Sequence, residues 1–200
     1  AYLLLWLARY EEADQVLQDA LQIAELELGP SLPPTPGWLL NRAQLALCHH
    51  MIGLLRLNTA RFEEAEQHLH QAIDVLTPLS DDQPRMIWAS CELGRWHHDL
   101  AEALTAMDRL EAAKEARRES LATWESAGRP VPAAFPYGKG LAHYRLGELL
   151  HHTGRVDEAR QQFSLGQAIM EDLATRRPNE SICHWQLICL LANCPDAELR

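Results

Sequence analysis

The stretch from Leu141 to Phe163, LAHYRLGELLHHTGRVDEARQQF, places the strongest constraint on the fold of this chain. Apolar residues recur in its first half at helical spacing, and Thr153-Gly154-Arg155 interrupts them before a second apolar face begins at Val156. Gly147 and Ala159 put small side chains where two paired helices would meet, and bulk at either position would push the helices apart. The stretch therefore predicts two closely packed helices joined by a tight turn.

The second apolar stripe of this stretch, which steps by three and four residues from Val156 to Met170, recurs three times upstream, beginning at Tyr10, Phe62 and Leu110. An arginine precedes each stripe, and acidic residues open each one, where they favour the exposed amide groups of a first helical turn. A glycine or alanine lies twelve residues before each stripe alanine, and these alanines occupy positions 13, 65, 113 and 159. Four copies of one pattern predict an all-α repeat fold of antiparallel helix hairpins.

The pattern resembles the tetratricopeptide (TPR) repeat, which also combines glycine, alanine and a large residue at fixed offsets. The stripe alanines are 46 to 52 residues apart, whereas the standard repeat is about 34 residues long, so the helices and connectors must be extended. Leu146 to Ala159 and residues 190–200 resemble segments of TPR arrays attached to bacterial serine/threonine protein kinases and related signalling proteins. The resemblance implies a right-handed α-solenoid, a TPR-like superhelix.

We expect a single solenoid over residues 1–200, with proline-bearing breaks at Gly29–Gly37, Thr77–Pro84 and Gly128–Gly140. The expected units are 1–28, 38–77, 85–126, 141–175 and a partial unit 181–200. Within them we predict helices at 1–7, 9–28, 38–58, 61–77, 85–106, 109–126, 141–153, 156–175 and 181–193. The chain opens without methionine at the small-residue position of a repeat, so we also expect a fragment of a longer protein.

Composition excludes several classes of function. The formal charge of −10 argues against a nucleic-acid or anionic-membrane surface, because phosphate binding needs a basic footprint. No apolar run approaches the roughly 18 residues of a membrane-spanning helix, so no membrane insertion is expected. Five scattered cysteines without a C-x-x-C pair suit reduced thiols, which favours a cytoplasmic protein without a metal or other cofactor.

The resemblance to TPR arrays implies that the first helix of each unit lines a concave face, which would bind a peptide or a partner domain. Two alternatives are that this face is merely solvated or that it packs against another domain of the parent chain. The positions that carry over to this face are Leu47, His50, Leu54, Leu57, Asn58, Arg95, His98, Glu102, Thr105, Leu141, Tyr144, Glu148, His151 and His152. His50 and Leu54 stand where the carboxylate clamp of co-chaperone TPR domains needs lysine and asparagine, so chaperone-tail binding is not expected.

Three His-His pairs, at 49–50, 97–98 and 151–152, raise a metal hypothesis. Adjacent helical residues point about 100° apart, so a site would need His50, His98 and His151 or His152 to converge with a carboxylate such as Glu102 or Glu148. Against this, positions 49, 97 and 143 share one repeat slot that normally packs between helices. We therefore predict a structural role for these histidines and no metal site.

The third unit is irregular, because Arg117 occupies the slot held by Leu69 and Phe163. A buried unpaired arginine is too costly, so we expect helix 109–126 to be rotated, with Ala112, Ala116 and Trp124 facing inward.

No catalytic residues are predicted, since neither a G-x-S-x-G sequence nor the protein-kinase motifs G-x-G-x-x-G, H-R-D and D-F-G occur. The chain itself is thus expected to be a non-catalytic protein–protein interaction scaffold. One alternative is a regulatory or sensor region of a larger bacterial serine/threonine kinase or transcription regulator. Another is a self-association module, because uncapped repeat ends would leave apolar faces open to a second copy.

Overall fold

The structure is a computed structural model that describes residues 7–28, 38–82, 87–126 and 137–195. The predicted helix at 1–7, apart from its last residue, and the predicted connector Gly29–Gly37 lie outside the described residues, as does most of the connector before Gly138.

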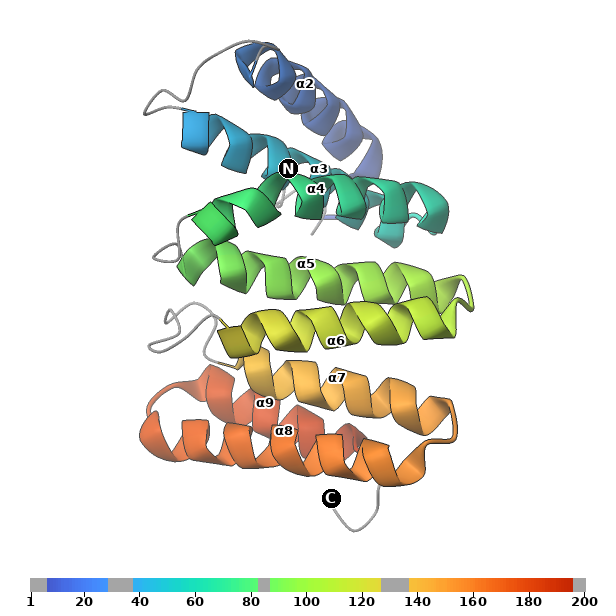
Figure 1. Cartoon of the computed structure of the whole chain (residues 1–200), viewed down its shortest axis with the longest axis vertical. Coiled ribbons are helices and arrows are strands. Elements are labelled where there is room, and N and C mark those ends of the chain that lie inside the picture. The colour runs from blue at the N-terminus through green and yellow to red at the C-terminus, as the bar shows by residue number, and fades with distance from the viewer. Residues whose placement is uncertain (1–6, 29–37, 83–86, 127–136, 196–200) are drawn as a thin grey trace.

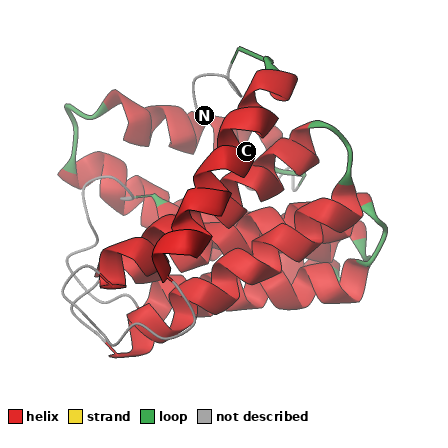
Figure 2. Ribbon diagram, turned by 90° about the horizontal axis from the view of Figure 1, so that it is seen from above, coloured by secondary structure: helices red, strands yellow, loops and turns green. Residues whose placement is uncertain are grey.

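The described residues form helices and connecting turns, with no strand among them (Figure 2). Within these residues, no helix combines the length and the apolarity needed to cross a membrane. The helices are α2 (Tyr10–Leu28), α3 (Trp38–Asn58), α4 (Phe62–Asp82), α5 (Ile87–Ala106), α6 (Leu110–Ser126), α7 (Gly138–His152), α8 (Val156–Arg176) and α9 (Ser181–Asn193).

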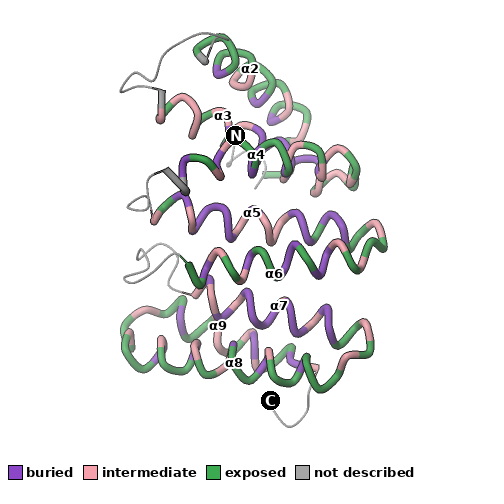
Figure 3. The backbone as a smooth tube through the Cα atoms, viewed as in Figure 1, coloured by how far each residue is buried: buried purple, intermediate pink, exposed green. Residues whose placement is uncertain are grey.

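Helices α3 and α4, α5 and α6, and α7 and α8 form three antiparallel hairpins that stack in chain order along the long axis of the molecule (Figure 1). Each helix packs chiefly against its neighbours in sequence. The chain is thus an α-solenoid of helix hairpins, as the repeated stripes predict. Buried residues run along α5 and α7 in the middle of the stack, whereas α2 and α8 expose more of their length (Figure 3).

The hairpin turns share one backbone geometry. Ala60, Asp108 and Gly154 each have a positive φ, at 57°, 58° and 77°, and each lies five residues before a stripe alanine. The next amide in each turn reaches back to the helix that ends there, as in the 2.8 Å bond from Arg155 N to Leu150 O. This is the Schellman arrangement, which satisfies a terminal carbonyl and reverses the chain.

Small residues set how closely the paired helices approach. A Cβ added to Gly53 would lie 2.8 Å from Leu69 Cγ, and one added to Gly147 would lie 2.7 Å from Phe163 Cδ1. Leu69 and Phe163 are nearly fully buried, so the large residue of each second helix fills the space that the glycine of the first helix leaves open. This confirms the predicted reason for the small residues.

Helix α4 is longer than predicted, ending at Asp82 rather than at residue 77. It passes through Pro78, which lacks an N–H and so leaves one helical carbonyl without its usual donor. Leu76 and Leu79, on either side of Pro78, are 0% and 1% exposed, so the buried face of α4 continues past the proline. Tertiary packing therefore overrides the break that Pro78 predicts.

The prediction for α6 is wrong for Arg117, which it turned away from the core, although Ala116 and Trp124 are buried as predicted. Arg117 is buried, at 5% exposed, together with the stripe residues Ala113, Ser120 and Trp124. The helix keeps the register of α4 and α8 because Arg117 is not unpaired: its guanidinium forms an ion pair with Glu102 on α5.

Candidate partner-binding face

The residues predicted to bind a partner fall into three groups by exposure. Leu47, Asn58, Glu102, Thr105, His151 and His152 are exposed, Leu54, Leu57, Arg95, His98, Leu141 and Glu148 are half-buried, and His50 and Tyr144 are buried. A partner can reach the first two groups without rearrangement of the fold.

The structure corrects the assignment of His50 and Tyr144 to an open surface. His50 is fully buried, with its ring stacked on Trp96 at 4.9 Å between centroids and its Nε2 atom 2.8 Å from Asp99 Oδ2. Tyr144 is 4% exposed, and its ring lies 5.3 Å from that of Phe163. Both side chains belong to the packing between helices.

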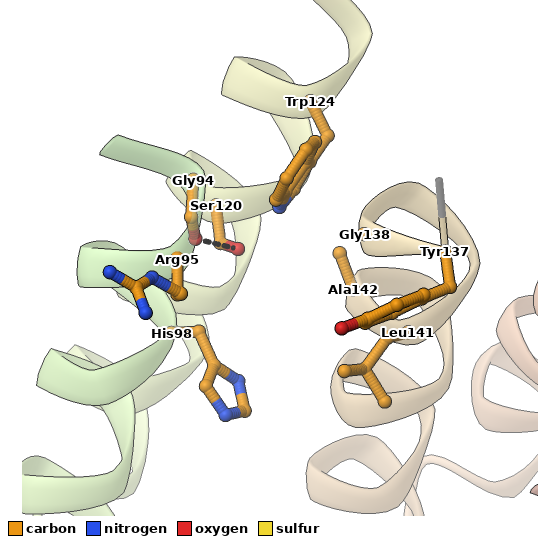
Figure 4. A pocket seen from close by; sticks show the side chains of 9 residues that line it. All are labelled: Gly94, Arg95, His98, Ser120, Trp124, Tyr137, Gly138, Leu141 and Ala142. Carbon is orange, nitrogen blue, oxygen red and sulfur yellow. Dashed lines mark hydrogen bonds between the residues drawn. The ribbon is translucent and has the colours of Figure 1, made fainter. Parts of the chain in front are cut away.

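A cavity of about 150 Å³ lies between α5, α6 and α7, and we call it the His98 cavity (Figure 4). Its lining combines aromatic and aliphatic side chains with glycine backbone and a few cationic or polar groups. The lining residues are Gly94, Arg95, His98, Ser120, Trp124, Tyr137, Gly138, Leu141 and Ala142. Arg95, His98 and Leu141 were among the predicted binding residues, and the fold brings them to one opening.

The wall of the His98 cavity depends on two glycines. A Cβ at either Gly94 or Gly138 would overlap the indole of Trp124, so both glycines let this ring lie between α5 and α7. Ser120 Oγ donates a 2.6 Å hydrogen bond to Gly94 O, which ties α6 to α5 beside the indole. Trp124, from the second helix of the hairpin, thus forms an aromatic wall of the cavity.

A second cavity of about 260 Å³ adjoins the first, between α7, α8 and α9. Leu141 lines both cavities, so they lie on either side of the first turns of α7. Its lining residues are Leu141, Tyr144, Arg145, Glu148, Met170, Gln186, Cys189, Leu190 and Asn193. The two cavities together offer alternating apolar and polar positions along α5, α7 and α9.

Ion pairs surround the His98 cavity. Arg117 bonds both Glu102 and the Nδ1 atom of His98. Burial lowers the pKa of His98 to about 4, and the charge of Arg117 contributes to that lowering. Burial also lowers the pKa of the Arg117 guanidinium, although Glu102 opposes that effect. His98 is consequently neutral at pH 7 while Arg117 and Glu102 form a charged pair.

Comparable pairs flank both cavities. Arg95 Nη2 lies 2.5 Å from Glu92 Oε2 on α5, and Arg145 Nη1 lies 2.7 Å from Glu148 Oε2 on α7. Burial, and after it the carboxylate of Glu148, raises the pKa of Tyr144 to about 12, which keeps the phenol protonated. The face therefore carries many charges and little local net charge.

The paired histidines act within the fold. His49 Nδ1 lies 3.2 Å from His68 Nδ1, and His143 Nδ1 lies 2.8 Å from Gln162 Oε1, each joining the two helices of a hairpin. Burial lowers the pKa of His49 and of His97 to about 4, with a smaller contribution from the neighbouring histidine. Over the part of the chain that the structure describes, no three His, Cys, Asp or Glu side chains are arranged to hold a metal ion.

Sequence reasoning missed Tyr137, Gly138 and Gly94 as parts of the cavity wall. A signal did exist: Trp124 falls in the stripe slot of Leu76 and Met170, and small residues face it from both neighbouring first helices. Only the packing of one hairpin on the next shows that these small residues leave a space open beside the indole.

Helix hairpins that stack in chain order, each closed by the same turn, define an α-solenoid of the tetratricopeptide type. The tetratricopeptide repeat family matches residues 1–31, and the later hairpins repeat the pattern of this segment. Residues 1–31 thus resemble the tetratricopeptide repeat, a class that generally mediates protein–protein interactions.

The solved structures that resemble the chain include two of TPR-like repeats from a Podosopora anserina protein described as a kinesin light chain. One of them, a form with a single substitution, is 16% identical, covers 92% of this chain and 93% of its own, and has a TM-score of 0.48. The other is 15% identical, covers 86% and 75%, and has a TM-score of 0.40. No curated protein matches the chain significantly.

Proposed function

We propose that this chain is a non-catalytic interaction scaffold that binds a peptide or a partner domain on the face formed by its first helices. The observation that carries the proposal is the pair of adjoining cavities that share Leu141 and open among predicted binding residues of α5 and α7. Concave, mostly apolar sites with a few convergent polar groups are the usual form of a binding site. The same face would serve a separate protein or another domain of a longer chain.

Two leucines provide a matched test. Leu141 is half-buried between the cavities, whereas Leu165 is 43% exposed on the opposite helix of the same hairpin. Peptides selected from a random displayed library should lose at least about tenfold in affinity with Leu141→Asp, because the new carboxylate would be desolvated by the ligand. Leu165→Asp should leave the affinity unchanged. Equal losses in both variants, or a loss only with Leu165→Asp, would contradict the proposal.

Self-association through α9 is a second candidate function. Ile182, Trp185 and Ile188 are 42%, 62% and 57% exposed, and they form one face of the only described helix that lacks charged residues. Because the whole chain carries a charge of −10, a neutral helix is where a second copy would meet the least repulsion. Sedimentation velocity should show a dimer that Trp185→Glu converts to monomer. A wild-type chain that stays monomeric at high micromolar concentration would exclude this candidate.

The proposed location is the cytoplasm. All five cysteines lie in the described parts of the chain, three of them buried, and they form no disulfide there, which suits a reducing compartment.

A further inference from the structure

The His98 cavity has the size of a single side chain. Its volume is about 150 Å³, and an apolar cavity of roughly 150 Å³ can hold a benzene molecule. Trp124, Tyr137 and Leu141 supply aromatic and aliphatic walls, so the interior suits a large apolar group (Figure 4).

His98 presents a hydrogen-bond donor to this cavity. The guanidinium of Arg117 can only donate, so the Nδ1 atom that it contacts must be the acceptor. The proton of the neutral imidazole therefore resides on Nε2. Within the described residues, Nε2 of His98 has no hydrogen-bond partner. A ligand that fills the cavity satisfies this donor only if it carries an acceptor next to its apolar group.

The charge balance favours a neutral acceptor over a carboxylate. Arg117 is paired with Glu102, Arg95 lies against Glu92, and Arg145 lies against Glu148, so each of these guanidinium groups is balanced by a carboxylate. A charged ligand carboxylate would also approach a chain whose net charge is −10. The carbonyl of a peptide bond provides an acceptor without this cost.

We propose that the His98 cavity receives one large apolar side chain, of leucine or phenylalanine, from an internal segment of an extended peptide. A main-chain carbonyl of that peptide accepts the hydrogen bond from His98 Nε2. The inference rests on the proposed scaffold function and specifies which part of a peptide ligand binds in the His98 cavity.

Neutral amino-acid amides are suitable probes, because they carry one side chain and two peptide carbonyls. N-acetyl-leucinamide, titrated into the ¹⁵N-labelled chain, should give saturable NMR shifts at the Trp124 indole and at Leu141, with a dissociation constant of roughly millimolar order for so small a ligand. N-acetylglycinamide, which lacks the side chain, should give no saturable shift. N-acetyl-leucine, which ends in a free carboxylate, should bind more weakly than the amide.

Two variants and one control locate the interaction. His98→Phe removes the donor and should lower the affinity for N-acetyl-leucinamide by about tenfold at most, the range of a single neutral hydrogen bond. Since this variant also removes a partner of Arg117, Leu141→Trp provides a second test by crowding the cavity mouth. His70→Phe changes an exposed histidine of α4 that neither lines the cavity nor belongs to the predicted binding face, and it should leave binding unchanged. Circular dichroism confirms that each variant is folded.

The proposal is overturned if N-acetyl-leucine binds more tightly than the amide, if glycinamide binds equally well, or if folded His98→Phe and Leu141→Trp both bind like wild type. These results would leave the scaffold function standing, provided that longer selected peptides still depend on the first-helix face. Conversely, selected peptides whose affinity is unchanged by Leu141→Asp would contradict the scaffold function even where the amide probe binds.

Discussion

The buried ion pair of the third hairpin predicts two opposite responses to mutation. Arg117 is 5% exposed, whereas the side chain of Glu102 is 48% exposed. Glu102→Gln removes the carboxylate that pairs with this buried guanidinium. Breaking a fully buried pair costs about 3–5 kcal/mol of stability. Because Glu102 is half exposed, we expect Glu102→Gln to lower the free energy of unfolding by only about 1–2 kcal/mol.

Arg117→Leu should be nearly neutral or stabilising, because it restores the residue type of Leu69 in the equivalent slot. The substitution removes a buried Nε that has no hydrogen-bond partner, and it leaves behind only a carboxylate that water can reach. We therefore expect a change within about 1 kcal/mol of wild type. Once Arg117 is leucine, adding Glu102→Gln should cost little more, since the two effects are coupled.

Urea unfolding followed by circular dichroism measures these differences, and thermal unfolding should show the Tm of Glu102→Gln lowered by about 2–8 °C. The reasoning is refuted if Arg117→Leu destabilises the chain more than Glu102→Gln does. That result would mean that the arginine contributes net stability beyond neutralising its own burial.

Three further predictions concern the turns, the helix contacts and the histidines. Ala60→Gly should stabilise by about 0.5–1 kcal/mol and Gly154→Ala should destabilise similarly, because both positions have positive φ and only glycine adopts it without strain; urea midpoints test this. Gly147→Ala should cost about 1–3 kcal/mol, since its Cβ would lie 2.7 Å from Phe163, and Phe163→Leu should recover part of the loss in a double-mutant cycle. The pKa of His97 is about 4 in the fold, below its ordinary value of 6.5, so the unfolded state binds more protons between these pH values. The contribution of neutral His97 to the free energy of unfolding is therefore full above about pH 6.5. It is lost as the pH falls towards 4, by at most about 1.4 kcal/mol per pH unit. Unfolding of wild type and His97→Gln from pH 7 to 4 should show a shallower pH dependence in the variant, and parallel curves would contradict it.

Local patterns in the sequence were sufficient to predict the hairpins. The spacing from Val156 to Met170 and its upstream copies requires helices with one apolar stripe, and a small residue such as Gly147 requires a close partner. These are short-range properties, because helical periodicity and turn formation depend on residues a few positions apart. The same information could not show where α4 ends, since Pro78 predicts a break locally and the buried Leu79 outweighs it.

The candidate binding face was only partly predictable, because exposure depends on residues distant in sequence. The repeat register placed His98 and Leu141 on the correct helices, but it could not distinguish them from His50, which Trp96 and Asp99 of the next hairpin bury. Likewise, the cost of burying Arg117 was correctly judged from its chemistry, while the carboxylate that offsets it lies fifteen residues away on a facing helix. Local sequence determined the helices and their turns, and only the packing of one hairpin against the next decided which side chains remain open to a partner.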